Sequence, residues 1–337
     1  MSVPIAFLIC TEPGRLEKQS LLLAESIRQF GGNLKDTPIY SFHPRQGEPI
    51  SSKTIKELES LAVHHQQIIL NTDYFSYPYA NKPLVCDYAE QNIDADILVF
   101  LDSDQCFFNE PKELLLPSNF NIGLRPEYGK SIGSTGSGDT FEDYWLKLYD
   151  VFDVKEEIFV KPAIGNTKIR GYWNSGMVSA RRSAGIFTAW KDNFMKLMKL
   201  NITPPQASYF IDQIVLSITI CSRAEKVFHF SSPYSYPFPL HNRLSEKYKL
   251  NSFDEIVSIH YFNMFYYNNW NISLNKIKIL KNKSEKYKWL CDNIARHNMP
   301  HLKMSQYYLF QIKSIENKLK KLNINLNFSN YLERVLN

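Results

Sequence analysis

Two aspartates separated by a single residue, Asp102 and Asp104, are the residues whose types and spacing most directly suggest chemistry. They follow ILVFL, an uninterrupted apolar run typical of a buried strand. Side chains alternate along extended backbone, so the two carboxylates point the same way and can share one cation or a cation-bound phosphate group. A hard divalent ion such as Mg²⁺ or Mn²⁺ suits these oxygen ligands. The alternative is a solvated Asp-x-Asp turn that binds nothing.

Three later segments also place polar residues in apolar surroundings. In the sequence WNSG, Asn174 offers a hydrogen-bonding amide and Gly176 can let the backbone pass close to a ligand, although an ordinary turn would use the same residues. Asp212 and Gln213 interrupt an apolar stretch, and a carboxylate there is expected to be paired or functional because leaving it buried and unsatisfied is costly. His260, in the run IHYF, is either a metal ligand or a core histidine.

The first hundred residues alternate between strand-like and helix-like patterns. Strands are predicted at residues 3–9, 38–42, 67–70 and 96–101, and helices at residues 16–30, 52–64 and 81–91. Strands joined by helical crossovers predict an α/β fold with a doubly wound, mostly parallel sheet, in which ligands bind beyond the carboxyl ends of the strands. Asp102 and Asp104 fall at that edge, and so does the loop that begins with Thr11 and Glu12.

The pattern continues to about residue 271. Further strands are predicted at residues 121–125, 171–180, 227–230 and 256–261, and helices at residues 183–200 and 206–222. Residues 129–140 are rich in Gly and Ser but lack the spacing of a phosphate-binding loop, which predicts a flexible loop or lid. From Lys276 onward a helical pattern, broken at Pro300, indicates an appendage. We therefore expect one domain over residues 1–271 and a helical extension over residues 272–337.

Composition indicates a globular protein of the cytoplasm. The chain of 337 residues has 20 Tyr and 22 Phe, which suits aromatic-lined clefts for flat ligands or sugars. Five cysteines without metal-site or redox spacing predict reduced thiols. No apolar run reaches the length of a membrane span and the N-terminal segment lacks the features of a secretory signal, so we expect neither insertion nor secretion.

Charge is distributed unevenly. Residues 273–337 contain 13 Lys and Arg against 4 Asp and Glu, a net charge of +9, whereas the rest of the chain carries −4. A basic helical tail predicts either a solvated surface or peripheral attachment to the anionic cytoplasmic face of a membrane. We do not expect a nucleic-acid partner.

The segments FLDSD, WNSG, DQ and IHYF, in this order, resemble the motifs of A-type-fold glycosyltransferases. The likeness is greatest to the retaining, family-8-like enzymes that use nucleotide-sugar donors, and it covers roughly residues 3–265. It implies a Mn²⁺ or Mg²⁺ cofactor held by Asp102, Asp104 and His260. After His260, however, the family commonly has Lys-Pro-Trp, where this chain has Asn263-Met264-Phe265. The group that clamps the diphosphate is therefore left open between the pair Arg181-Arg182 and basic residues near Arg243. Lys82 is either a surface lysine or, as the resemblance implies, a basic residue that faces the nucleotide.

The resemblance also implies site residues and an activity. Residues expected to bind the nucleotide-sugar donor are Thr11, Glu12, Lys82, Asp102, Ser103 and Gly176. Residues expected to act in catalysis are Asp212, Gln213 and Asn174. The expected reaction transfers a hexose from a nucleoside diphosphate sugar, with UDP as the expected nucleotide, to a hydroxyl of a glycan or glycolipid with retention of configuration. Gln213 or Asp212 would stabilise an oxocarbenium-like centre.

Other activities stay open from the sequence. An inverting glycosyltransferase would need a general base, for which Asp212 and the loop residues Glu142 and Asp143 are candidates. A sugar nucleotidyltransferase would also combine a doubly wound sheet with a metal, but its Gly-rich, Arg-containing signature is missing after the first strand. A noncatalytic nucleotide-binding protein would bind a nucleoside diphosphate with metal and turn over no donor.

Overall fold

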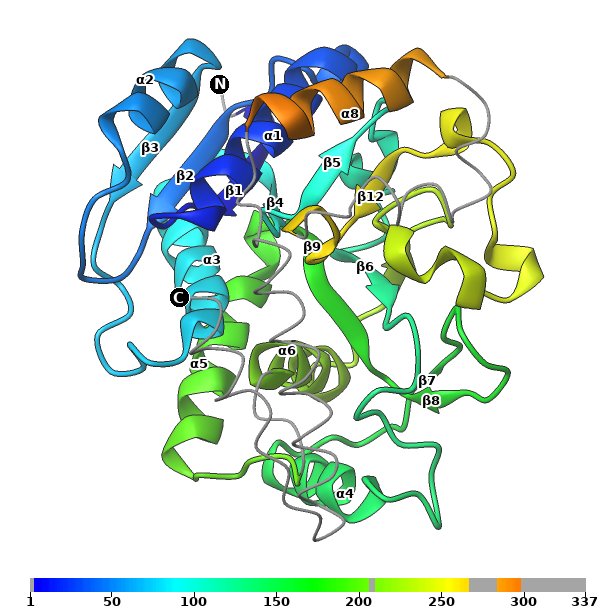
Figure 1. Ribbon diagram of the computed structural model, residues 1–337. Coiled ribbons are helices and arrows are strands. Elements are labelled where there is room, and N and C mark those ends of the chain that lie inside the picture. The colour runs from blue at the N-terminus through cyan, green and yellow to red at the C-terminus, as the bar shows by residue number, and fades with distance from the viewer. Residues whose placement is uncertain (1–2, 206–209, 267–283, 298–337) are drawn as a thin grey trace, which may run out of the picture. The chain divides into compact units, whose positions relative to one another are not determined.

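A computed structural model describes residues 3–205, 210–266 and 284–297 (Figure 1). The chain forms two compact units, residues 1–261 and 262–337, which are treated separately. The second unit contains helix α8 (Glu285–Arg296), begun by Ser284, whose hydroxyl accepts a hydrogen bond from the Lys286 amide. Most of the predicted basic extension lies outside the described residues, so the division at residue 271 stays a prediction.

The first half of unit 1 alternates strands and helices as the sequence predicts. The elements are β1 (Val3–Cys10), α1 (Arg15–Phe30), β2 (Ile39–His43), α2 (Ser52–Ser60), β3 (Val63–Gln67), α3 (Asn81–Asn92) and β4 (Ala95–Leu101). The second half is less regular. Its elements are β5 (Gln105–Phe107), β6 (Ile122–Pro126), α4 (Glu142–Val151), β7 (Phe159–Val160), β8 (Ile169–Arg170), β9 (Trp173–Arg181), α5 (Ile186–Lys199), α6 (Ile211–Ser222), β10 (Val227–His229), β11 (Tyr236–Pro237) and β12 (Ser258–His260).

The central sheet has seven strands in the order β10-β6-β9-β4-β1-β2-β3. Neighbouring strands are parallel except that β9 runs antiparallel to both β4 and β6. The predicted α/β fold with a mostly parallel sheet is therefore confirmed. The reversed direction of β9 has a consequence for the site, because its amino end meets the carboxyl ends of β4 and β6 at one edge of the sheet.

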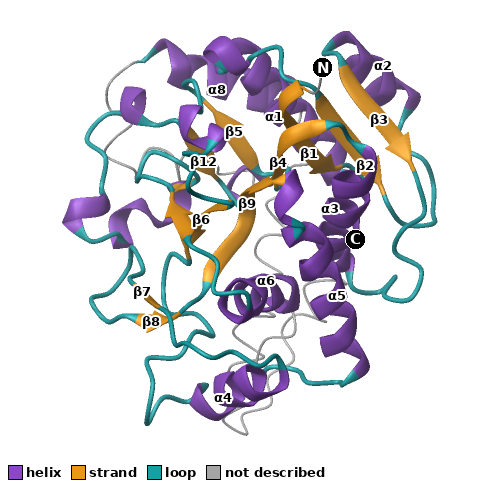
Figure 2. Ribbon diagram, turned by 180° about the vertical axis from the view of Figure 1, so that it is seen from behind, coloured by secondary structure: helices purple, strands orange, loops and turns teal. Residues whose placement is uncertain are grey.

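Both faces of the sheet are covered, which explains why β1 and most of β4 are apolar. Along β1, Ala6 and Leu8 pack into one buried cluster and Ile5, Phe7 and Ile9 into another. The first cluster includes side chains of α3, α5 and α6, helices that lie together in Figure 2. The second includes side chains of α1. Because side chains alternate between the two faces of a strand, each strand contributes residues to two separate hydrophobic clusters.

The edge strand β3 lies earlier than predicted. The expected helix over residues 52–64 ends at Ser60, because the backbone turns at Ala62, which has a left-handed φ of 51°. Residues 63–67 then pair with β2, so the strand predicted at residues 67–70 is wrong. Most side chains of β3 are exposed or half-buried, as expected for an edge strand, and their polar character disguised it.

Helix α4 and the short strands β5, β7, β8 and β11 were not predicted, whereas β12 lies within the strand predicted at residues 256–261. Glu142 and Asp143 lie in the first turn of α4 rather than in a loop. A three-stranded sheet of β11, β12 and β5 stands beside the main sheet. The predicted helix over residues 206–222 begins at Ile211 in the described part, and residues 206–209 lie outside it. Among the described residues, no helix combines the length and apolar character needed to cross a bilayer.

Candidate active site

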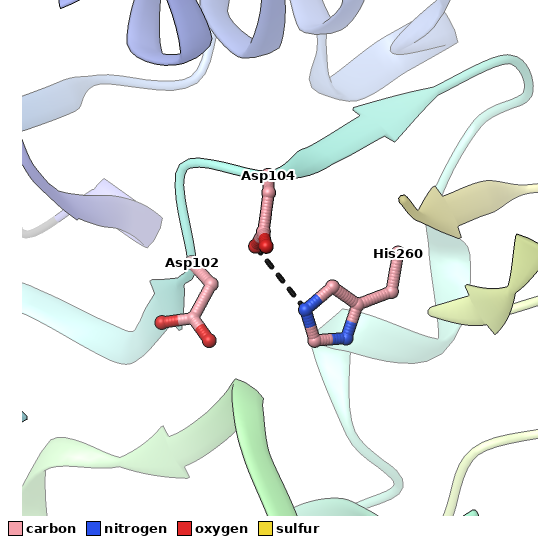
Figure 3. A group of neighbouring side chains, drawn as sticks. All are labelled: Asp102, Asp104 and His260. Atoms are coloured by element: carbon pink, nitrogen blue, oxygen red, sulfur yellow. Dashed lines mark ion pairs between the residues drawn. The ribbon is translucent and has the colours of Figure 1, made fainter. Parts of the chain in front are cut away.

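Asp102, Asp104 and His260 meet at the carboxyl end of β4 (Figure 3). Asp102 follows β4, and its amide donates a hydrogen bond of 2.9 Å to the carbonyl of Gly176. Asp104 precedes β5, which pairs antiparallel with β12 and so brings His260 opposite Gln105. One ligand atom from each of the three side chains lies within 4.8 Å of the others. The small sheet therefore assembles the cluster that the sequence motifs imply.

The imidazole of His260 is oriented through both ring nitrogens. Nε2 lies 3.1 Å from Oδ1 of Asp104, and Nδ1 lies 3.0 Å from the hydroxyl of Tyr128. Burial alone would raise the pKa of Asp104, but the interaction with His260 holds it below its usual value. The ring of His260 is thus fixed with Nε2 toward the carboxylates, as a metal-ligating histidine needs.

Gly176 leaves the space between the ligands open. A Cβ atom at this position would lie 2.9 Å from each of three atoms, Oδ2 of Asp102, Oδ1 of Asn174 and Cε1 of His260. A side chain here would therefore occupy the space that Asp102 and His260 border. Two carboxylates and one imidazole around such a space fit Mn²⁺ or Mg²⁺, so the residues present match the predicted cofactor.

Lys82, in the first turn of α3, is the cation of this site. Its Nζ lies 2.9 Å from Asp102, 3.2 Å from Oγ of Ser175 and 3.5 Å from Asp212. Burial raises the pKa of Asp102, and Lys82 opposes that shift. Two of the alternative basic residues are engaged elsewhere: Arg181 donates to the carbonyls of residues 116, 117 and 120, and Arg182 pairs with Asp94. The basic residues near Arg243 stay an untested alternative.

Asp212 is buried in the first turn of α6 and fully engaged. Oδ1 accepts a hydrogen bond of 3.1 Å from Tyr77, and Oδ2 accepts one of 2.9 Å from Ser175 in addition to the contact with Lys82. The side-chain Oε1 of the next residue, Gln213, accepts a hydrogen bond of 3.2 Å from the amide of Ser175. The expectation that a carboxylate on this apolar helix is paired is therefore met, and it is paired with residues of the site.

Glu127, which the sequence analysis did not consider, belongs to the same network. It follows β6, and its Oε2 accepts hydrogen bonds of 3.1 Å from Asn174 and 2.9 Å from Gln213. Burial raises the pKa of Glu127, although both amides favour the ionised form. A signal like the one that found Asp102 could have found it, because Asp102 directly follows a predicted strand and Glu127 lies two residues after one.

A cavity of about 680 Å³ extends from Asp102, Ser103 and Lys82 along the ends of β1 and β2. Glu12 borders it, but its carboxylate is held by Arg45 at 2.5 Å and by Asn81 at 3.0 Å. Thr11 is buried, and its hydroxyl lies in a chain of hydrogen bonds from Ser41 to Thr11 to Ser20. Ser103 and Lys82 also border the cavity, and they too have protein partners, since Ser103 donates to Gln19 and Lys82 contacts Asp102.

A mostly parallel sheet with an Asp-x-Asp pair at its carboxyl edge, joined there by a histidine from a small second sheet, is the arrangement of A-type-fold glycosyltransferases. Residues 7–224 match the family model described as Rhodobacterales glycosyltransferase domain, and the chain belongs to this family. No curated protein sequence is significantly similar to it. The particular likeness to family-8-like enzymes stays a prediction.

Two solved structures of glycosyltransferases are similar to this chain. WbbM, a bifunctional glycosyltransferase, has a TM-score of 0.55 and 14% sequence identity, with 86% of this chain and 52% of WbbM covered. The glycosyltransferase GlyE of Streptococcus pneumoniae TIGR4 has a TM-score of 0.47 and 9% identity, with 86% of this chain and 64% of GlyE covered. The chain thus spans about half the length of WbbM. At this identity the likeness to WbbM establishes the fold alone.

Proposed function

We propose that this glycosyltransferase moves a hexose from a nucleoside diphosphate sugar, with UDP as the expected nucleotide, to a hydroxyl of a glycan or glycolipid, with the help of Mn²⁺ or Mg²⁺. The observation that carries the proposal is the convergence of Asp102, Asp104 and His260 within 4.8 Å at the edge of a cavity. The cavity volume of about 680 Å³ lies in the range of small-molecule sites.

The charges around the cavity support a diphosphate leaving group. A divalent ion held by Asp102, Asp104 and His260 would neutralise the charge that develops on the departing diphosphate. Lys82 adds a protein cation beside Asp102, at a distance of 2.9 Å. This lysine can turn to a phosphate oxygen without leaving the site, because Asp102 and Asp212 both lie within its reach.

The hydrogen bonds of Asp212 favour the retaining course. Both of its oxygens already accept from Tyr77, Ser175 and Lys82, which leaves it poorly placed to take a proton from an acceptor. In the retaining course the attacking hydroxyl approaches the face that the diphosphate leaves and gives its proton to a phosphate oxygen. Gln213 would then contact the reacting sugar from the position its bonds to Ser175 and Asn174 impose.

For the inverting alternative, the bases considered from the sequence are poorly placed. Glu142 forms an ion pair of 2.5 Å with Arg170, and Asp143 is exposed on α4. Glu127 is the better candidate, because burial raises its pKa and it contacts both Asn174 and Gln213. The anomeric configuration of the product, assigned by NMR, decides between the two courses.

The test is hydrolysis of a panel of nucleotide sugars without acceptor, with and without EDTA. We expect slow hydrolysis of one donor that EDTA abolishes and Mn²⁺ restores. Asp104→Asn should reduce it by at least about 100-fold, since it removes a charge that acts on the leaving group. Asp96→Asn is the matched control, because Asp96 is exposed near the opposite end of the same strand. Hydrolysis that ignores EDTA would contradict the metal, and binding without any turnover would favour a noncatalytic nucleotide-binding protein.

A further inference from the structure

Tyr128 connects the proposed metal site to the loop that precedes β11. Its hydroxyl oxygen lies 3.0 Å from Nδ1 of His260, 2.8 Å from Oγ of Ser235 and 2.9 Å from the carbonyl oxygen of Ser235. Tyr128 is 1% exposed, so these contacts are made away from solvent. The hydroxyl is therefore placed where it can decide which nitrogen of His260 carries a proton.

The hydrogen-bond geometry of Tyr128 favours one assignment of its single proton. A carbonyl oxygen only accepts, so the contact of 2.9 Å with Ser235 is a hydrogen bond when Tyr128 gives its proton there. The phenol oxygen then accepts from Nδ1 of His260, which places a proton on Nδ1. In the opposite assignment the phenol proton would lie toward Nδ1, and two buried oxygens would face each other at 2.9 Å without a proton between them, which is costly.

Ser235 is held in a conformation that few serines adopt. Its φ of 43° lies in the left-handed region. Its amide donates a hydrogen bond of 2.8 Å to Oγ of Ser258 in β12, and its own Oγ accepts one of 2.9 Å from Nε2 of Gln105 in β5. The small sheet that carries His260 therefore also fixes the carbonyl that takes the proton of Tyr128, and strain held in place by its neighbours is typical of a functional position.

A buried cation fixes the rest of this loop. Arg125 is 5% exposed, and its Nη1 donates hydrogen bonds of 2.8 Å to the carbonyl of Ser232 and 2.5 Å to the carbonyl of Tyr234. The guanidinium carbon of Arg125 also lies 5.7 Å from the centre of the ring of Tyr128. One side chain thus holds both the loop before Ser235 and the ring that reaches it.

The proton on Nδ1 has a consequence for the opposite side of the His260 ring. Nε2 lies 3.1 Å from Oδ1 of Asp104. A nitrogen lone pair and a carboxylate oxygen repel each other at this distance unless a proton or a metal ion lies between them. Mg²⁺ is a hard ion that takes oxygen ligands, whereas transition metals such as Mn²⁺ also accept an imidazole nitrogen.

We propose that Tyr128 is a positioning residue of the metal site: its hydrogen bond to the carbonyl of Ser235 keeps a proton on Nδ1 of His260, reserves Nε2 for the ion and so favours Mn²⁺ over Mg²⁺. The proposal rests on the metal of the proposed function. Tyr128 lies outside the motifs on which the family resemblance depends, and it acts through His260.

The position of the proton on His260 can be measured directly in the full chain. ¹⁵N NMR of the histidine rings, with saturating Mg²⁺ as a diamagnetic ion, distinguishes protonated from unprotonated ring nitrogens, and His260→Gln identifies the signals of His260. We expect a proton on Nδ1 and none on Nε2. The reverse arrangement would overturn the proposal without the need for a variant of Tyr128.

Metal affinity tests the hydroxyl itself. Tyr128→Phe keeps the ring and should weaken Mn²⁺ binding, followed by the EPR signal of the free ion, by about 10-fold. Mg²⁺ binding, measured by competition with Mn²⁺, should weaken by no more than about threefold. Tyr236→Phe is the matched control, because the hydroxyl of Tyr236, in the same small sheet, lies 2.6 Å from Nδ1 of His241, which is not a proposed ligand. This control should bind Mn²⁺ within about twofold of the unchanged protein.

A double-mutant cycle separates positioning from a general loss of structure. In a His260→Ala background, Tyr128→Phe should cause no further loss of Mn²⁺ affinity, because its effect passes through His260. An equal loss in both backgrounds, or Mn²⁺ binding by Tyr128→Phe within about twofold of the unchanged protein, would overturn the role of Tyr128 while leaving the metal site intact. If the unchanged protein binds no Mn²⁺, the metal of the proposed function fails, and the role of Tyr128 fails with it.

Discussion

Replacing Gly176 with alanine tests the space between the proposed metal ligands. The added Cβ would lie 2.9 Å from Oδ2 of Asp102, Oδ1 of Asn174 and Cε1 of His260, which is several tenths of an ångström closer than ordinary contact. Overpacking of this kind costs about 1–3 kcal/mol, which corresponds to roughly 5- to 150-fold in an equilibrium constant. Because two of the three atoms belong to proposed ligands, we expect the cost to appear in metal affinity.

The measurement is a Mn²⁺ titration followed by the EPR signal of the free ion, together with EDTA-sensitive hydrolysis of the preferred donor. Gly129→Ala is the control, because a Cβ there would meet only a side-chain atom of Ile164 at 3.9 Å. Gly176→Ala should lose affinity for Mn²⁺ in the range above while its thermal unfolding stays cooperative, and Gly129→Ala should bind normally. A folded Gly176→Ala protein that binds Mn²⁺ within about twofold of the unchanged chain would refute the assignment of this space to an ion.

Three further predictions concern catalysis, acid stability and the tail. Asp212→Asn should lower kcat about 100-fold and leave KM nearly unchanged, because Asp212 contacts Ser175 and Lys82 and would orient them around the reacting sugar. Steady-state kinetics measure both constants, and an effect confined to KM would contradict this prediction. Burial alone would raise the pKa of Asp139, but hydrogen bonds from Phe141, Thr135 and Lys130 outweigh it and hold the pKa at about 2. The ionised Asp139 therefore stabilises the folded state above about pH 4, and this stabilisation is lost as the pH falls toward 2. Urea unfolding should show Asp139→Asn about 1 kcal/mol less stable at pH 7, with a difference that shrinks in acid; a constant difference would be the wrong outcome. The full chain should sediment with anionic vesicles at low salt and be released as the salt concentration rises, because salt screens the attraction of about 1 kcal/mol between each lysine and the anionic lipids. Absence of sedimentation at low salt would mean that the tail has no membrane role.

The fold was predictable where both faces of a strand are buried. β1 and β4 are apolar along their length, so their positions follow from the sequence. The position of the edge strand β3 was not predictable, because the strand buries few of its side chains and its run of histidines and glutamines is typical of a loop. α4 carried a usable signal, since Tyr144, Trp145 and Leu148 recur at helical spacing and are buried, but no helix was predicted there and Glu142 and Asp143 were assigned to the Gly-rich loop before it.

The site was predictable to the extent that motifs mark it. Asp102 and Asp104 stand after an apolar run, and the resemblance brought His260 to them. Glu127 could have been found by the same rule. The pairing of Glu12 with Arg45 could not, because it joins residues 33 positions apart through the geometry of neighbouring strand ends.

The small sheet of β11, β12 and β5 also has a consequence for the order in which the protein matures. Its last strand supplies His260, whereas both aspartates are present once β4 and the turn after it are made. During synthesis the chain must add more than a hundred residues between them, so a nascent chain carries only part of the cation site. Binding of a metal ion by all three side chains would then be a late step, and it would stabilise the pairing of β5 with β12 after the rest of the domain has formed.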